Sequence, residues 1–256
     1  MNISTLEWQE NQIRESGCYC MRSMQKAPGY IQKVNWTEQE LSRGLTYIQL
    51  RKNNKSVGFV EYTRGEQAWR AVHADGYLVI HCLWVGVTGA GIGSQLIQRC
   101  IEDAVKLGQK GVAVVTNTDT SWAPSPDVFL KNGFQLADKA PHSFQLYAYK
   151  LDPTFVDPYF PDNWAQRLER FGQGLTILRT RQCPYLEIAT QNVIEAAELL
   201  GIQPQIILMD NRPQLMELSP TPYGVFHVIF NGELISYHRL TPRSFAKKLK
   251  LLYSKT

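Results

Sequence analysis

Four glycines within eight residues form the part of this chain best suited to bind an anion. Gly86, Gly89, Gly91 and Gly93 lie between a long apolar run and an amphipathic segment. Glycine has no Cβ, so a glycine-rich backbone can turn tightly and approach a ligand closely. Free N–H groups at the start of a following helix, together with the helix dipole, would make this loop a binding site for a pyrophosphate.

Two common nucleotide-binding motifs do not fit this loop. A P-loop requires Lys and then Ser or Thr after its last glycine, whereas Ile92 and Gly93 follow Gly91. A dinucleotide-binding turn requires Gly-x-Gly-x-x-Gly, whereas residues 89–93 read Gly-x-Gly-x-Gly. A tight strand-to-helix turn that binds no ligand is the remaining alternative.

The segments beside the loop predict the elements that would hold it in place. Residues 76–87 are a long apolar run that contains Val, Ile and Trp, which is typical of a buried strand. Residues 94–108 carry apolar side chains at helical spacing and end on Gly108, a suitable C-cap. Further strands are predicted at 47–50, 57–62, 112–117 and 144–151, and a short helix at 126–133.

A change in composition predicts a domain boundary. Residues 152–164 contain three prolines, which interrupt both helix and sheet. We therefore expect a first domain at 1–151, a linker with a short helix at 152–174, and a second domain at 175–256. The second domain has the predicted order β-α-β and then ββ-α, with a hairpin turn at Asn231-Gly232 and a last helix that begins at Pro242.

Composition narrows the class of protein. The chain has 256 residues, of which 44% are hydrophobic, and a net charge of +4. Such a small excess does not indicate nucleic acid as a partner, although it suits a small anionic ligand. The sequence has no run of about 18 apolar residues and no signal peptide, so we expect no membrane contact. The five cysteines are an odd number, which favours reduced thiols in the cytoplasm. Cys18 and Cys20 lack the spacing of a zinc site, and no metal is expected.

The order of these segments resembles the GNAT superfamily of acyl-CoA-dependent N-acyltransferases. Residues 88–93 fit the signature Arg/Gln-x-x-Gly-x-Gly/Ala, except that Thr88 replaces Arg or Gln. FLKNGF at 129–134 is similar to the family segment FYEKxGF. GCYC near the start, ADGYLVIHCLW at 74–84, and QCPY and TPYGVF in the tail resemble GNAT proteins that carry a YoaP-like C-terminal domain.

The resemblance implies an α/β fold with a mixed sheet and acetyl-CoA, or another acyl-CoA, as the co-substrate. The pyrophosphate would lie on the amides of the glycine loop, and the pantetheine arm would pair with the edge of the strand at 76–87. A small amine would attack the thioester directly, and a backbone N–H would stabilise the oxyanion. The implied cofactor-binding residues are Trp84, Val85, Val87, Thr88, Gly89, Ala90, Gly91, Ile92, Gly93, Ser94 and Asn117.

Several residues are candidates for the acid and the base of the reaction. Leu130 stands where many GNAT enzymes have a general-acid Tyr, so the acid is missing or is replaced by Tyr147 or Tyr149. Glu61 lies in an apolar strand, where a raised pKa would suit a general base. An outward-facing or salt-bridged carboxylate is the alternative. His81 is a second candidate, with a hydrogen-bonded core histidine as the alternative.

The tail resembles a small thioredoxin-like fold. Cys183-Pro184-Tyr185 follows its first strand, and the resemblance implies a cis peptide bond at Pro222. Leu186 stands at the position of a second active cysteine, so no internal disulfide is expected there. At a helix N-terminus, Cys183 would have a lowered pKa and be the most reactive of the five thiols. An inert cysteine is the alternative.

Three functions follow from these patterns. The first is an N-acyltransferase that acts on a small amine or an amino-acid-like acceptor, with Glu61, His81 and Cys183 as candidate catalytic residues. The second is a CoA-binding or thiol-sensing module without turnover. The third is a monothiol redox protein. The sequence leaves open whether the protein forms a homodimer.

Overall fold

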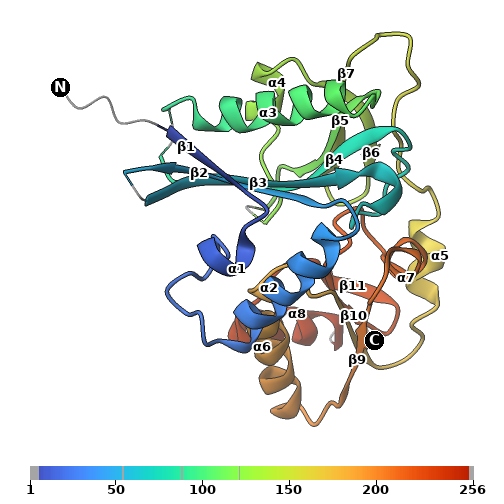
Figure 1. Ribbon diagram of the computed structural model, residues 1–256. Coiled ribbons are helices and arrows are strands. Elements are labelled where there is room, and N and C mark those ends of the chain that lie inside the picture. The colour runs from blue at the N-terminus through green and yellow to red at the C-terminus, as the bar shows by residue number, and fades with distance from the viewer. Residues whose placement is uncertain (1–5, 54, 88, 121, 254–256) are drawn as a thin grey trace.

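The protein folds around two β-sheets, shown in the computed structural model of Figure 1. The structure describes residues 6–253 except 54, 88 and 121. The larger sheet has the strand order β1-β2-β3-β4-β5-β7-β6, in which β4 and β5 are parallel and the other neighbours antiparallel. Its strands are β1 (Leu6–Glu10), β2 (Thr46–Lys52), β3 (Lys55–Arg64), β4 (Tyr77–Val85), β5 (Gly111–Asn117), β6 (Gln135–Ala140) and β7 (Phe144–Lys150).

The smaller sheet belongs to the C-terminal part of the chain. Its order is β11-β10-β8-β9, with β8 and β9 parallel and the other pairs antiparallel. Its strands are β8 (Leu175–Arg179), β9 (Pro204–Leu208), β10 (Phe226–Phe230) and β11 (Glu233–Ser236). The predicted hairpin is confirmed, although β11 ends earlier than expected.

Helices cover both sheets. They are α1 (Ile13–Ser16), α2 (Pro28–Leu41), α3 (Ile92–Lys106), α4 (Asp127–Lys131), α5 (Trp164–Glu169), α6 (Leu186–Glu198), α7 (Arg212–Leu218) and α8 (Pro242–Tyr253), with a 3-10 helix at Gly65–Gln67. Figure 1 shows α3 and α4 on one face of the larger sheet, and α2 with the C-terminal unit on the other. None of the helices in the described ranges is long and apolar enough to span a membrane.

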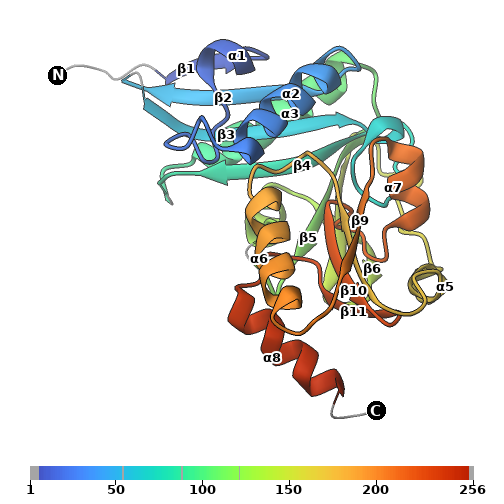
Figure 2. The ribbon, with the colours of Figure 1, turned by 90° about the horizontal axis from the view of Figure 1, so that it is seen from below.

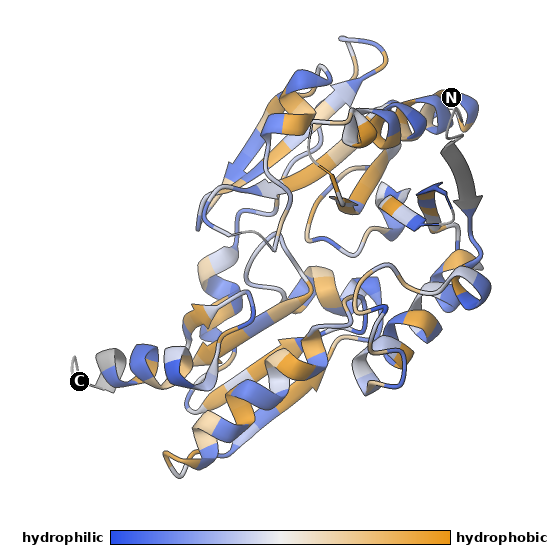
Figure 3. Ribbon diagram, turned by 90° about the vertical axis from the view of Figure 1, so that its left-hand side faces the viewer, coloured by the Kyte–Doolittle hydropathy of each residue, from blue (hydrophilic) through white to orange (hydrophobic). Residues whose placement is uncertain are grey.

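The hydrophobic side of α3 explains why this helix forms and where it packs. Leu96, Ile97 and Cys100 recur at helical spacing, and all three are fully buried against Ile80 and Val114 of the sheet. Figure 3 shows the same pattern across the molecule, with hydrophobic residues concentrated on strands and alternating with hydrophilic ones on helices. The helix is thereby fixed with its N-terminus at the glycine loop.

A bulge in β4 decides which side chains face the C-terminal unit. Glu61 pairs with Cys82 and Tyr62 pairs with Ile80, so His81 is the extra residue on β4. Ile80 and Leu83 pack on the α3 side, whereas His81 and Cys82 both line a cavity on the opposite side. Without the bulge, simple alternation would place these two neighbours on opposite faces.

The strands β4 and β5 separate halfway along their length. Their pairing ends at Ile80 and Val114, although β4 continues to Val85 and β5 to Asn117. Beyond this point β5 stays paired with β7. The backbone of β4 from His81 onward therefore has an edge that its neighbour β5 does not cover.

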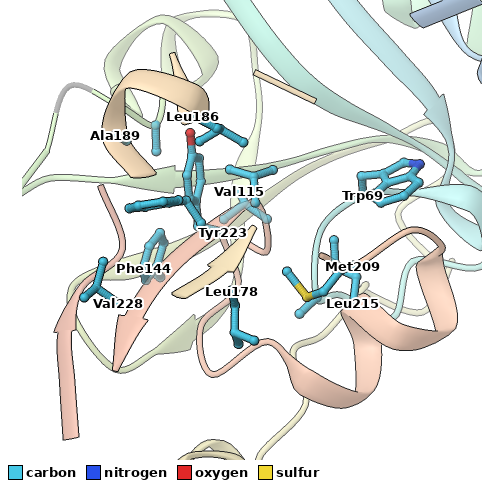
Figure 4. Packing of buried hydrophobic residues seen from close by; sticks show 14 of the residues in the cluster. Trp69, Val115, Phe144, Leu178, Leu186, Ala189, Met209, Leu215, Tyr223 and Val228 are labelled. Carbon is cyan, nitrogen blue, oxygen red and sulfur yellow. The ribbon is translucent and has the colours of Figure 1, made fainter. Parts of the chain in front are cut away.

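The two sheets share one hydrophobic core rather than forming separate globules. Val115 and Phe144 of the larger sheet belong to the same buried cluster as Val228 of the smaller sheet. Figure 4 shows Val115 and Phe144 near Tyr223 and Val228. The second sheet lies below the first in Figure 1, and in the view from below of Figure 2 its strands overlap β5 and β6. The proline-rich linker is also packed, because Phe160 and Trp164 are buried in this cluster. The fold thus fixes the C-terminal unit against the face that carries Glu61 and His81.

Candidate active site

A cavity of about 220 Å³ lies between β3, β4 and the C-terminal unit. We call it the central cavity. Its polar residues come from both parts of the chain, and aromatic side chains and cysteines make up much of the rest of its lining. The lining residues are Cys18, Cys20, Lys33, Phe59, Glu61, Arg70, His81, Cys82, Trp84, Trp122, Gln182, Cys183, Pro184, Tyr185, Tyr223 and Val225.

Glu61 is the centre of a buried polar network. One carboxylate oxygen pairs with Nζ of Lys33. The other oxygen accepts a hydrogen bond of 2.9 Å from Nε2 of Gln182 and lies 3.3 Å from Nδ1 of His81. The side chains of Glu61, Lys33 and His81 are almost fully buried. The carboxylate thus receives partners from α2, from β4 and from the C-terminal unit.

These partners lower the pKa of Glu61, whereas the sequence analysis expected a raised pKa. Burial raises the pKa of the carboxyl group, but the Lys33 ammonium and the His81 contact outweigh burial and hold that pKa at about 2. The expectation of a raised pKa was therefore wrong, and the salt-bridged alternative describes the residue. A carboxylate with such a low pKa is a weak base near neutral pH.

His81 is neutral and is buried beside Glu61. Its Nε2 accepts a hydrogen bond of 2.8 Å from the backbone N–H of Trp69. The hydrogen must then be on Nδ1, which faces Glu61. Burial lowers the pKa of His81 to about 4, in spite of the opposing effect of Glu61. His81 Nδ1 lies beside the Glu61 carboxylate but makes no hydrogen bond at this separation.

Arg70 is a site residue that sequence analysis did not single out. Its guanidinium donates to the carbonyl oxygens of Trp69 and His81 and, over 2.7 Å, to Oε1 of Gln182. The residue is only 5% exposed, and burial lowers its pKa. It lies in the irregular segment after the 3-10 helix, where no periodic pattern marked it.

Lys33 was missed for a different reason. It lies on α2, whose buried face also contains Trp36, Thr37 and Glu40. Glu40 accepts a hydrogen bond of 2.9 Å from the indole N–H of Trp69. Because this helix buries charged and polar groups, the apolar periodicity that reveals other helices is absent.

The pKa of Cys183 differs from the one that the sequence predicted. Cys183 lies three residues before α6 begins at Leu186, so it does not sit at the first turn of the helix. Burial raises the pKa of Cys183 to about 11 and that of Cys82 to about 12. The expected lowered pKa of Cys183 was therefore wrong, because burial outweighs any helix dipole at this distance. Burial also raises the pKa of Cys18 and Cys20.

The segment around Pro222 forms a wall of the cavity without a cis bond. No peptide bond among the described residues is cis, so the implied cis geometry at Pro222 was wrong. The Pro222 carbonyl instead accepts a hydrogen bond of 3.1 Å from the backbone N–H of Ala71. This bond ties the loop that carries Tyr223 to the segment that carries Arg70.

The glycine loop lies at the N-terminus of α3, as expected. Gly91 is the N-cap of α3 with φ 71°, and Gly89 has φ 80°; a Cβ at either would meet nothing within 4 Å. The first amides of a helix have no intrahelical partner, and here these are the N–H groups from Ile92, Gly93 and Ser94 onward. The loop residues Val87 and Ala90 are exposed. Thr88 lies outside the described residues.

The other expected cofactor residues divide into two groups. Trp84 and Val85 lie on the part of β4 that β5 does not cover, and the Trp84 side chain also lines the central cavity. The side-chain amide of Asn117 is already used, because it donates to the His142 carbonyl at 2.8 Å and accepts from the Asp119 N–H at 2.7 Å. Asn117 therefore shapes the loop after β5.

The two tyrosines that were expected to replace the missing general acid at Leu130 do not line the central cavity. Leu130 is 48% exposed on α4. Tyr147 and Tyr149 pack with the cluster on the α3 side of the sheet, and neither lines the central cavity. Tyr223 does line it, with its ring 5.2 Å from the Arg70 guanidinium carbon.

Comparison with known proteins assigns the first half of the chain. The model of the acetyltransferase (GNAT) family matches residues 8–134, a range that includes the glycine loop and Glu61. A curated relative, an uncharacterized N-acetyltransferase YoaP of Bacillus subtilis (strain 168), is 26% identical over 238 residues. That match covers 92% of this chain and 93% of the relative.

Solved structures give weaker matches to part of the chain. The PaiA N-acetyltransferase from Thermoplasma acidophilum, in complex with coenzyme A, is 14% identical with a TM-score of 0.43 and covers 57% of this chain and 99% of that one. An N-acetyltransferase from Staphylococcus aureus Mu50 is 16% identical with a TM-score of 0.44 and covers 58% and 100%.

Proposed function

Since residues 8–134 form an acetyltransferase domain of the GNAT family, we propose that this protein transfers an acetyl group from acetyl-CoA to the amine of a small acceptor in the central cavity. One observation carries the proposal. The uncovered edge of β4 runs from the glycine loop to the central cavity, so a single extended ligand can reach both.

The glycine loop is the proposed site of the CoA pyrophosphate. The open space around Gly89 and Gly91 leaves room for phosphate oxygens, and the amides of Ile92, Gly93 and Ser94 would donate to them. Asn132 donates to the Ser94 hydroxyl oxygen over 3.0 Å and so holds the first turn of α3 against α4. The pantetheine arm would then follow the β4 edge past Val85 and Trp84.

The acceptor amine would attack the thioester where β4 meets the cavity. The C–N bond would form first and turn the carbonyl oxygen into an oxyanion, which a backbone N–H of the uncovered β4 edge would stabilise. The C–S bond then breaks, CoA leaves as a thiolate that takes a proton from the protein, and the proton that the nitrogen loses restores that donor. Glu61 is not a suitable base, because its pKa is held at about 2. The Lys33 ammonium is paired with Glu61, so Arg70 is the cation without a counter-charge in the cavity, and its positive charge favours the neutral form of a bound amine.

Tyr223 is the proposed proton donor to the departing CoA thiolate. Its pKa is raised well above the usual value by burial, so the phenol keeps its proton. Tyr185 also lines the cavity, but it is only partly buried, whereas Tyr223 is 6% exposed. No hydrogen bond of the Tyr223 hydroxyl to another described residue is present, which leaves that hydroxyl free to donate to a ligand.

We infer a thioredoxin-like fold for the C-terminal unit, in the role of a wall of the acceptor site. The order β11-β10-β8-β9 with the β8-α6-β9 crossover supports this inference. A redox role has less support, because Leu186 is fully buried where a second cysteine would be needed. The unit contributes Gln182, Cys183, Tyr185 and Tyr223 to the cavity.

A calorimetric titration with CoA tests the cofactor site. Gly91→Glu would place a carboxylate where the pyrophosphate binds, and we expect it to weaken CoA binding at least about tenfold, through loss of charge-assisted hydrogen bonds. Gly108→Glu is the matched control, because Gly108 follows the other end of α3 with φ 63° and equally open surroundings. Equal CoA affinity in both variants would place the pyrophosphate elsewhere, and no binding to the wild type would remove the proposal.

A further inference from the structure

Arg70 is a buried cation that has no acidic partner. It is 5% exposed and lines the central cavity. Its hydrogen bonds go to two carbonyl oxygens and to the neutral amide of Gln182. No Asp or Glu pairs with it within the part of the chain that the structure describes.

The charges around the cavity leave one positive charge unbalanced. Lys33 is neutralised by Glu61 through a direct ion pair. His81 is neutral, because burial lowers its pKa to about 4. The cavity thiols stay protonated near neutral pH, since burial raises their pKa values. Arg70 is therefore the charge that remains.

A buried charge of this kind is unfavourable unless something compensates it. Buried charged groups in proteins are normally paired with an opposite charge, because the cost of removing them from water is several kcal/mol. Three of the five guanidinium N–H groups have acceptors here, and the Tyr223 ring covers one face. The other two N–H groups have no acceptor among the described residues, and Arg70 lines the cavity, so we expect them to be available to an anion that enters it.

We infer that Arg70 binds the carboxylate of the acceptor, and that the acceptor is a small amino acid rather than a simple amine. This inference rests on the proposed function and names its substrate class. A cavity of about 220 Å³ lies below the usual range for drug-sized ligands, about 300–1,000 Å³, and so suits a molecule of this size. A planar guanidinium matches a carboxylate in charge and in shape.

Gln182 is the residue that holds the two halves of the site together. Its Oε1 accepts from Arg70 at 2.7 Å, while its Nε2 donates to Glu61 at 2.9 Å. The side chain is 5% exposed and belongs to the C-terminal unit. Through Gln182, the C-terminal unit orients the Arg70 guanidinium. The unit would therefore take part in selecting the acceptor, which residues 8–134 could not do alone.

The test compares acceptors that differ only at the carboxyl group. Leucine, phenylalanine and serine are each assayed with acetyl-CoA beside their amides and their decarboxylated amines, with the N-acetyl product measured by mass spectrometry. We expect kcat/KM for the best acid to exceed that of its amide by about 10- to 100-fold, the range of a lost charge-assisted hydrogen bond. Equal or better use of the amide or amine would overturn the inference and leave the proposed function intact.

Three variants test whether Arg70 is the source of the preference for the acid. Arg70→Gln should lose it, Arg70→Lys should keep part of it, and Arg64→Gln, which alters an exposed arginine on β3, should keep all of it. CoA titration and thermal melting of each variant show whether the fold is retained. An acid preference that survives in folded Arg70→Gln would overturn the inference.

A second measurement does not depend on turnover. Calorimetry with the wild type should show that the N-acetyl acids bind and that the N-acetyl amides bind at least about tenfold more weakly. Equal binding of the N-acetyl acids and the N-acetyl amides would also overturn the inference. So would the absence of any binding of the N-acetyl acids at concentrations up to about 10 mM. Failure of CoA to bind would instead count against the proposed function.

Discussion

At the scale of single residues, the sequence identified candidate site residues but could not give their protonation states. Glu61 and His81 were identified as site residues from their place in apolar strands, and both line the cavity. Their protonation states could not be predicted, because these depend on Lys33 and Gln182, which are 28 and 121 positions away from Glu61 along the chain. Long-range partners of this kind leave no local pattern.

Tyr223 gives the sharpest prediction at this scale. Tyr223→Phe keeps the ring and removes the hydroxyl, so we expect kcat to fall by about 100-fold or more, as is typical when a general acid is lost. CoA affinity should stay the same, since the glycine loop is untouched. Steady-state kinetics with calorimetry would measure both.

Tyr149→Phe is the control for this experiment. Tyr149 packs against Phe134 on the other side of the sheet, with ring centroids 5.8 Å apart. A normal kcat in Tyr223→Phe, or an equal loss in both variants, would remove Tyr223 from the proton transfer.

At the scale of elements, the sequence predicted what hydrophobic periodicity can reveal. The buried strand β4, the helix α3 and the hairpin of β10 and β11 were all expected, because their apolar patterns match the faces that they bury. Helix α2 was not, since its buried face carries Lys33, Thr37 and Glu40. The bulge at His81 could not be predicted from the sequence either, because it is defined by the pairing of β4 with β3.

The ion pair that α2 makes with β3 can be tested by a double-mutant cycle. Glu61→Gln leaves the Lys33 ammonium buried without a counter-charge, so we expect a loss of about 3–5 kcal/mol in the free energy of unfolding. Adding Lys33→Met removes that uncompensated charge and should recover part of the loss. Urea unfolding of the four proteins would measure the coupling. Additive effects would show that the pair does not link the helix to the sheet.

At the scale of the whole molecule, the shared core explains why the two units form one site. Residues of both sheets belong to one buried cluster, and Arg179 of β8 donates to Gln32 of α2 at 2.9 Å. The proline-rich segment predicted as a linker does differ in composition from its neighbours. It is nevertheless packed, because Phe160 and Trp164 belong to the shared core. Sequence could indicate the two units but not how they pack.

This common core makes stability depend on pH through buried neutral histidines. Burial lowers the pKa of His227 to about 3 and that of His81 to about 4, below the value of about 6.5 in an unfolded chain. The unfolded state therefore binds more protons between these values, and stability that is complete above pH ~6.5 is lost as the pH falls toward 4.

We expect each histidine to contribute about 3 kcal/mol of this loss between pH 7 and 4. Denaturant unfolding at a series of pH values would measure it. His227→Gln retains a polar group beside Thr221, whose hydroxyl lies 2.9 Å from Nε2 of His227, and should flatten the curve. An unchanged slope in that variant would show that His227 is not the group that titrates.

The central claim is acetyl transfer within a site built by both units, and product formation tests it most directly. The 256-residue protein is incubated with acetyl-CoA and an amine panel that includes the free amino acids, and N-acetylated products are identified by mass spectrometry. We predict an N-acetyl amino acid that accumulates with the amount of enzyme and is lost in Gly91→Glu but not in Gly108→Glu. Tight CoA binding without any N-acetylated product across that panel would contradict the account.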